Sequence, residues 1–143
     1  MQAKDIIGLK GSDVRTIARD ATLNQAISDL AEHKIGALLV VDASAKPCGI
    51  ISERDIVRVL AGAPTGFRDH KVEEAMTAEL ITCAPSDSVD TLMDRMTDRR
   101  IRHLPVMEKG ELKGLLSIGD VVKHRMREVR EEADALKSYI SHG

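Results

Sequence analysis

A nine-residue phrase occurs twice in this 143-residue chain, and it constrains the fold more than any other feature. GIISERDIV begins at Gly49 and GLLSIGDVV begins at Gly114, and both copies keep the Gly, the Ser and the Asp. The similarity extends upstream, where Ile35 and Ile101 also align. The first pair lies 65 positions apart and the second 66, so the second copy has lost one residue in an intervening turn. Such self-similarity predicts that one small fold is built twice.

Each copy contains a predicted amphipathic helix that starts at a capping residue. Thr22 is a candidate N-cap with Gln25 completing a capping box, and Ser88 is the cap in the second copy. Apolar residues follow both caps at helical spacing. The four in each copy match position for position: Leu23, Ala26, Ile27 and Leu30, then Val89, Leu92, Met93 and Met96.

Short apolar strands surround these helices, and a second helix follows each copy of the phrase. The strands are predicted at 14–18, 35–41 and up to Ser52, and again at 80–84, 101–107 and up to Ser117. The predicted fold class is therefore α+β, with β-α-β-β-α twice and a C-terminal helical extension. A copy of roughly 60 residues does not easily bury its own sheet face. We expect the two copies to share a core with pseudo-twofold symmetry.

Composition excludes several classes of partner. The net charge is −2, and the chain has one Phe, one Tyr and no Trp, so no nucleic-acid partner is expected. The longest apolar run, 37–41, is too short to span a bilayer, and the N-terminus lacks the apolar core of a signal peptide. We therefore expect a cytoplasmic protein with no membrane partner.

Cysteine and histidine spacing gives no sign of a metal site or of catalysis. Cys48 and Cys83 are predicted to be buried free thiols rather than a disulfide, given the expected reducing compartment. No Cys or His pair has metal-ligand spacing, and no catalytic triad or glycine-rich phosphate loop is present. The chain is predicted not to be an enzyme.

Both copies place a serine at a strand end and an aspartate three residues later. These pairs are Ser52 with Asp55 and Ser117 with Asp120. One interpretation is purely structural, because Ser-x-x-Asp at a strand-to-helix junction is also a capping box. The other is a nucleotide site: free N–H groups at a helix start attract phosphate, and an aspartate accepts hydrogen bonds from ribose hydroxyls.

One cation lies beside the first pair in the sequence, and two candidate cations begin a strand of the second copy. Arg54 adjoins Asp55, and Arg102 and His103 begin the inner strand of the second copy. Arginine binds phosphate bidentately, which favours the ligand interpretation. The alternatives are a solvated arginine and a packed or surface histidine.

The inner strands of the two copies differ. Pro105 cannot donate to a sheet ladder, so its strand is predicted to be an edge or to be interrupted, which leaves a slot for a ligand. The first copy has Gly36 and Ala37 at the matching place and no cation. If both clefts exist, they should not be equivalent.

The C-terminal stretch has its own pattern. Apolar residues are spaced alternately by four and three positions, a heptad-like seam with charges on the other faces. They are Val122, Met126, Val129, Ala133, Leu136 and Ile140. The helix either packs back on its own domain or, as we expect, meets a second subunit.

The doubled unit, the two phrases and the stretch RIRHLPV (100–106) together resemble a CBS-domain pair, named after cystathionine β-synthase. The resemblance covers about 10–127 and includes VEEAMT (72–77), typical of the boundary between repeats. The predicted organisation is repeat 1 over 8–62, a connector over 63–75, repeat 2 over 76–127 and a C-terminal helix over 128–143.

The resemblance implies a regulatory module that binds adenosine-containing ligands in two clefts between the repeats. Family ligands include AMP, ADP, ATP, NAD and S-adenosylmethionine, and no other cofactor is implied. It also implies a homodimer. The chain has no room for an effector domain, so we expect a stand-alone module that signals in trans to an unknown effector protein. The alternative is a structural or protein-interaction module whose Ser-x-x-Asp pairs are only caps.

The resemblance also assigns roles to residues. Asp55 and Asp120 would hold ribose, while Ser52 and Ser117 would meet phosphate. Arg54 and Arg102 would face the phosphates. Backbone would line the adenine, around Thr16 and Ile17, around Thr82 and Cys83, and around either Gly36 and Ala37 or Arg102, His103 and Leu104. Pro105 is a further candidate ligand-binding residue.

Overall fold

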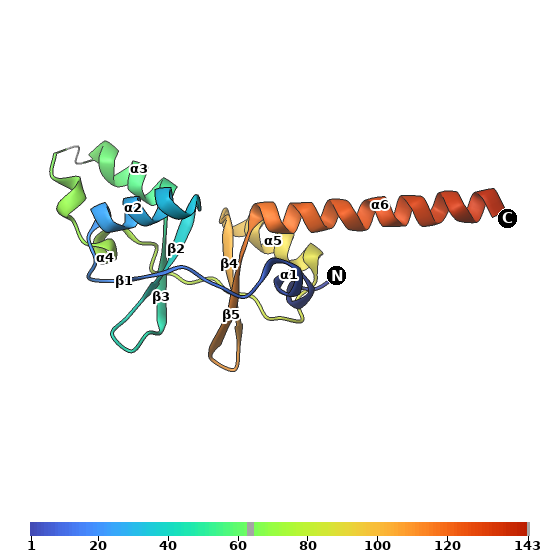
Figure 1. Ribbon diagram of the computed structural model, residues 1–143, viewed down its shortest axis with the longest axis horizontal. Coiled ribbons are helices and arrows are strands. Elements are labelled where there is room, and N and C mark those ends of the chain that lie inside the picture. The colour runs from blue at the N-terminus through green and yellow to red at the C-terminus, as the bar shows by residue number, and fades with distance from the viewer. Residues whose placement is uncertain (63–64, 143) are drawn as a thin grey trace. The chain divides into compact units, whose positions relative to one another are not determined.

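The computed structural model describes residues 1–62 and 65–142, which form two compact units (Figure 1). The first-repeat unit is 14–80, and the second-repeat unit joins 1–13 to 81–143. The N-terminal segment therefore belongs structurally with the second repeat. Residues 63–64 of the predicted connector lie outside the described residues.

The first-repeat unit is built on a three-stranded sheet in the order β1-β2-β3. β1 runs parallel to β2, with Ile17 beside Val40, and β2 runs antiparallel to β3, with Leu39 beside Ile50. The elements are β1 (Thr16–Ala18), α2 (Leu23–His33), β2 (Ala37–Val41), β3 (Pro47–Ser52), α3 (Glu53–Gly62), the short 3-10 helix η1 (Phe67–Asp69) and α4 (Val72–Ala75). Buried residues from the sheet, α2 and α4 form one core.

The second-repeat unit has a two-stranded antiparallel sheet, β4-β5. Its elements are α1 (Ala3–Lys10), α5 (Val89–Arg99), β4 (His103–Glu108), β5 (Glu111–Ser117) and α6 (Ile118–His142). Ile6 of α1 is fully buried together with Leu92, Leu104 and Leu116 in the core of this unit. The α+β class and the C-terminal helix are thus confirmed.

The strand predicted at 80–84 is reduced to a single parallel bridge between Cys83 and Val106. The neighbouring backbone groups are taken by side chains instead. The carbonyl oxygen of Thr82 accepts from Arg95 Nη1 (2.9 Å), and the Ala84 N–H donates to Asp87 Oδ2 (2.8 Å). These contacts leave no ladder for a longer strand.

The predicted caps are present in both repeats. Thr22 Oγ1 accepts from the Gln25 N–H (3.2 Å), and Gln25 Oε1 accepts from the Thr22 N–H (3.0 Å). Ser88 Oγ accepts from the Thr91 N–H (3.1 Å). These contacts, reciprocal only at Thr22, satisfy N–H groups that a helix start leaves free, which explains why α2 and α5 begin where they do.

The glycine of each repeated phrase has a steric explanation. A Cβ on Gly49 would lie 2.8 Å from both Met76 Sδ and the Thr77 carbonyl oxygen. A Cβ on Gly114 would clash with Ile7 Cδ1. Within each unit, therefore, the glycine lets a separate segment cross closely over the second strand of the hairpin.

Both cysteines are free, as predicted, but Cys48 is only partly buried, so the prediction of two buried thiols is wrong for Cys48. Cys83 is buried, and this burial raises the pKa of its thiol to about 12, with nearby Asp87 adding to the shift. Such a thiol is protonated and unreactive at neutral pH. None of the described helices combines the length and apolar character that crossing a bilayer demands.

Candidate functional site

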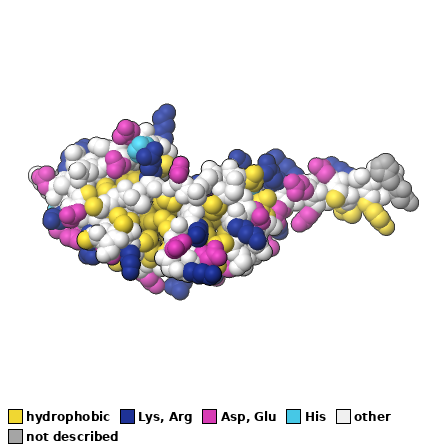
Figure 2. All heavy atoms as spheres, turned by 60° about the horizontal axis from the view of Figure 1, so that its bottom comes forward, with side chains coloured by type: hydrophobic (Ala, Val, Ile, Leu, Met, Phe, Trp, Pro, Cys, Tyr) yellow, Lys and Arg dark blue, Asp and Glu magenta, His cyan; other side chains and the backbone are white. Residues whose placement is uncertain are grey.

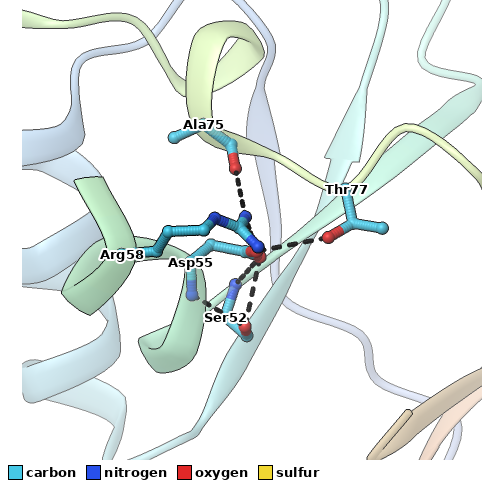
Figure 3. Close-up of polar contacts among 5 residues, drawn as sticks. All are labelled: Ser52, Asp55, Arg58, Ala75 and Thr77. Carbon is cyan, nitrogen blue, oxygen red and sulfur yellow. Dashed lines mark hydrogen bonds and ion pairs between the residues drawn. The ribbon is translucent and has the colours of Figure 1, made fainter. Parts of the chain in front are cut away.

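In the first repeat, Ser52 and Asp55 form a reciprocal capping box at the start of α3 (Figure 3). Asp55 Oδ2 accepts from the Ser52 N–H (2.9 Å) and from Ser52 Oγ (3.1 Å). The Asp55 N–H donates to Ser52 Oγ (3.3 Å). The structural part of the Ser-x-x-Asp interpretation is therefore present.

The second oxygen of Asp55 is also engaged. Oδ1 accepts from Thr77 Oγ1 (3.2 Å) and forms an ion pair with Arg58, whose Nη2 also reaches the Ala75 carbonyl oxygen (3.5 Å). Asp55 is 4% exposed. A ligand that donated hydrogen bonds to this carboxylate would have to displace Thr77 or Arg58.

The second repeat repeats the capping box with a different environment. Asp120 Oδ2 accepts from the Ser117 N–H (2.9 Å), and the Asp120 N–H donates to Ser117 Oγ (3.1 Å). Lys10 forms an ion pair with the same Oδ2 and donates to the Leu115 carbonyl oxygen (2.7 Å). The Asp120 side chain is 25% exposed, and its described hydrogen bonds all go to Oδ2. This carboxylate therefore remains accessible to a ligand.

The charges around Asp120 shift two pKa values. Partial burial of Asp120 would raise the pKa of its carboxyl, but hydrogen bonds from Lys10 and from the Ser117 backbone outweigh it and lower the pKa. Burial lowers the pKa of His103, and the positive charges of Lys10 and Arg102 lower it further against the opposing effect of Asp120. Asp120 is thus held ionised beside a cationic group.

The inner strands lie against both capping boxes. In the first repeat, Ala37 pairs with Ser52, and the Gly36 carbonyl oxygen accepts from the Glu53 N–H (3.1 Å). In the second, His103 pairs with Ser117, and the Arg102 carbonyl oxygen accepts from the Ile118 N–H (2.8 Å). Each unit therefore brings its predicted inner-strand residues to its own helix start.

The residues predicted to line the adenine offer mainly backbone. The side chains of Ile17, Cys83 and Leu104 belong to the core, and Pro105 is also buried. The Pro105 carbonyl oxygen accepts from the Cys83 N–H (2.9 Å). Thr82 lies next to this contact, and Thr16 is an exposed residue of β1.

Two cations that contact the aspartates were missed in the sequence. Arg54 is exposed, and the arginine that forms an ion pair with Asp55 is Arg58. The three-residue spacing on one helix could have indicated Arg58. Lys10 gave no signal, because 110 positions separate it from Asp120.

The second-repeat cluster can bind a polar, anionic ligand. It combines the positive dipole end of a 25-residue helix with an ionised aspartate, a lysine and a histidine. Helix starts and cations attract phosphate, while the carboxylate accepts from hydroxyls. Among residues 1–62 and 65–142, no three His, Cys, Asp or Glu side chains are grouped to hold a metal ion.

Comparisons with known proteins identify related sequences and folds. A family model described as the CBS domain matches residues 3–62 and 72–127. The chain is 40% identical over 128 residues to the CBS domain-containing protein CBSX3, mitochondrial, of Arabidopsis thaliana, a match that covers 87% of this chain. The chain spans only 62% of that relative's length.

Solved structures match the fold as well. The CBS-domain containing protein ATU1752 from Agrobacterium tumefaciens superposes with a TM-score of 0.85 and 43% identity, covering 87% of this chain and 92% of that one. Two more distant matches, each 26% identical with a TM-score of 0.75, contain ligands. PAE2072 from Pyrobaculum aerophilum is complexed with AMP, covering 84% of this chain and 89% of that one. The CBS domain pair of MJ0100 is in complex with 5-methylthioadenosine and S-adenosyl-L-methionine, covering 90% and 98%.

Proposed function

Since this chain belongs to the CBS-domain family and carries two CBS repeats, we propose that it is a regulatory module that binds an adenosine-containing ligand. The binding site proposed here is the Ser117–Asp120 cluster of the second repeat. AMP, ADP, ATP, NAD and S-adenosylmethionine are the ligands to be tested. The module is proposed to act without chemistry of its own, by passing its ligand-bound state to an effector protein.

The observation that carries this proposal is the contrast between the two aspartates. Asp55 is enclosed and has both oxygens engaged, whereas Asp120 is partly exposed beside the ammonium of Lys10. Ribose hydroxyls can donate to Asp120, and phosphate can meet the ammonium of Lys10 at the positive end of the α6 dipole. The AMP and S-adenosylmethionine complexes of the two relatives support the adenosine class.

A ligand-binding experiment tests the proposal. Thermal unfolding with each of the five ligands at millimolar concentration should show a rise in Tm with at least one, because a ligand that binds only the folded state stabilises it. Equilibrium dialysis with that ligand should then give a Kd that Asp120→Ala raises strongly. Asp98→Ala, at an exposed position of α5, is the matched control and should leave Kd unchanged. No response to any of the five ligands would contradict the proposal.

A purely structural role is the second candidate, and the capping geometry itself favours it. Both Ser-x-x-Asp pairs satisfy the N–H groups of their helix starts without any ligand. If they are only caps, Asp120→Ala lowers stability by about 1 kcal/mol and no nucleotide changes Tm. The same dialysis series separates the two candidates.

We also propose that the working form is a homodimer. The sequence predicts this from the seam on the C-terminal helix and from the family resemblance. A dimer would let ligand binding in each chain alter a surface that an effector recognises. The contact itself is developed below.

A further inference from the structure

The second half of α6 extends beyond the rest of its unit (Figure 1). Val121 and His124 are buried against the unit, but every residue from 129 to 141 is exposed. A stretch of this length is marginal as a helix in water unless something packs against it. The extension therefore needs a partner from outside the second-repeat unit.

One continuous apolar seam runs along this helix. Figure 2 shows apolar side chains on the projecting helix among charged ones of both signs. Exposed fractions reach 60% at Leu136 and 68% at Ile140, which are large values for aliphatic side chains. The seam is formed by Val122, Met126, Val129, Ala133, Leu136 and Ile140. It spans about 27 Å of helix, and the buried residues Val121 and His124 lie outside it.

We propose that this seam pairs with the same seam of a second copy, as a parallel, in-register two-stranded coiled coil. The spacing assigns Met126, Ala133 and Ile140 to position a of the heptad, and the other three seam residues to position d. The small Ala133 lets two helices approach closely at the centre. The proposal does not depend on the nucleotide site.

Charges flanking the seam exclude the antiparallel arrangement. Position e carries Lys123, Arg130 and Lys137, all of them cations. In an antiparallel pair, position e of one helix faces position e of the other. Every alignment would then set cation against cation, which is destabilising.

The same charges favour the parallel arrangement. There, position g faces position e of the next heptad, so Glu132 meets Lys137 of the second copy on both sides of the dimer. The one like-charged g–e pair across this interface is Arg125 with Arg130 of the second copy. Arg125 is already paired within its own chain, with Asp90 (3.3 Å) and Glu128 (3.5 Å), which reduces the repulsion. This charge pattern identifies a second copy of the chain as the partner.

The first test is the oligomeric state of the full chain by sedimentation equilibrium. Wild type should be a dimer, and Val129→Asp/Leu136→Asp should be a monomer. Ala135→Asp/Ser138→Asp adds the same charge off the seam and should remain a dimer. All four positions are exposed, so the thermal unfolding of the two units should be unchanged in both variants. A wild-type monomer, or a seam variant that stays dimeric, would overturn the proposal.

The second test concerns orientation, in a Cys48→Ser background. Val129→Cys and Leu136→Cys, made separately, should each form a disulfide with the same residue of the second copy under mild oxidation. In an antiparallel pair, a residue meets the same residue of the second copy only where it lies close to the twofold axis, so at most one of the two cysteines could form this disulfide. Cross-linking at only one of the two positions would therefore overturn the parallel arrangement. Glu132→Lys or Lys137→Glu should each raise the dimer dissociation constant by about tenfold, and the double exchange should restore it. Additive weakening in the double variant would also contradict the proposed register.

Discussion

Lys10, the last residue of α1, forms an ion pair with Asp120 at the start of α6. In the first repeat, the equivalent Asp55 instead pairs with Arg58 of its own helix and accepts a hydrogen bond from Thr77, in the segment after α4. The two repeats thus complete the same capping box with different partners. This difference makes one aspartate a closed structural element and leaves the other accessible.

The first prediction concerns the pH dependence that Lys10 gives to Asp120. The pKa of Asp120 is lowered in the folded chain, so its stabilisation is present above the ordinary aspartate pKa of about 3.9 and is lost as pH falls through the folded value. Lys10→Gln should move the pKa of Asp120 upward and lower stability at neutral pH by under about 1 kcal/mol. NMR titration of the Asp120 carboxyl measures the first effect, and urea unfolding at several pH values measures the second.

Lys113→Gln is the control for this prediction. Lys113 lies on β5 and pairs with exposed Glu111 rather than with Asp120. In the Lys113→Gln variant, the Asp120 carboxyl should titrate as it does in the wild type. An identical Asp120 titration in the Lys10 and Lys113 variants would show that the Lys10 ion pair is not formed in solution.

The second prediction separates the two aspartates by their effect on stability. Asp55→Ala leaves the Ser52 N–H and the Thr77 hydroxyl without their acceptor in a buried place, so it should cost about 2–3 kcal/mol. The Asp120 carboxylate is partly exposed, so Asp120→Ala should cost only about 1 kcal/mol, the worth of a cap. Urea unfolding of both variants, beside Asp98→Ala, gives the comparison. Equal costs at Asp55 and Asp120 would argue against the contrast on which the proposed site depends.

Local features of the fold could be predicted because their causes are local. Thr22 and Ser88 cap helices through contacts to residues three positions away, and spacing alone indicates them. The apolar stripes of α2 and α5 have the same short range.

Contacts between distant segments could not be predicted in this way. Lys10 meets Asp120 only because α1 packs over Gly114 of β5, and no periodicity connects the two segments. The missing strand at 80–84 has a similar origin, since Arg95 and Asp87 capture backbone groups that the pattern assigned to a ladder. The repeat located both Ser-x-x-Asp pairs, but it could not show that their surroundings differ.

The third prediction concerns the two repeated glycines. Gly49→Ala sets a Cβ against the Thr77 backbone oxygen, whose hydrogen bond from the Ile50 N–H (3.0 Å) would be strained. This variant should cost about 2–3 kcal/mol. Gly114→Ala meets only the end of the Ile7 side chain, which can move, so its cost should be smaller.

A double variant tests this steric explanation. Ile7→Val removes the Cδ1 atom that a Cβ on Gly114 would strike. In urea unfolding, Ile7→Val should therefore recover most of the stability lost in Gly114→Ala. Losses that simply add would mean that α1 does not pack over Gly114 in solution.

The last prediction uses a backbone feature that occurs in both repeats. α2 and α5 are followed by the C-cap residues Lys34 and Arg100, whose φ angles of 53° and 54° lie in the left-handed region. A side chain with a Cβ is strained there, and glycine is not. Lys34→Gly and Arg100→Gly should each stabilise the fold by about 0.5–1 kcal/mol, measured by urea unfolding. Glu32→Gly, within the last turn of α2, should instead cost about 1 kcal/mol, because glycine there only adds freedom to the unfolded chain. Destabilisation by both Lys34→Gly and Glu32→Gly would mean that α2 continues through residue 34 rather than ending in a left-handed turn.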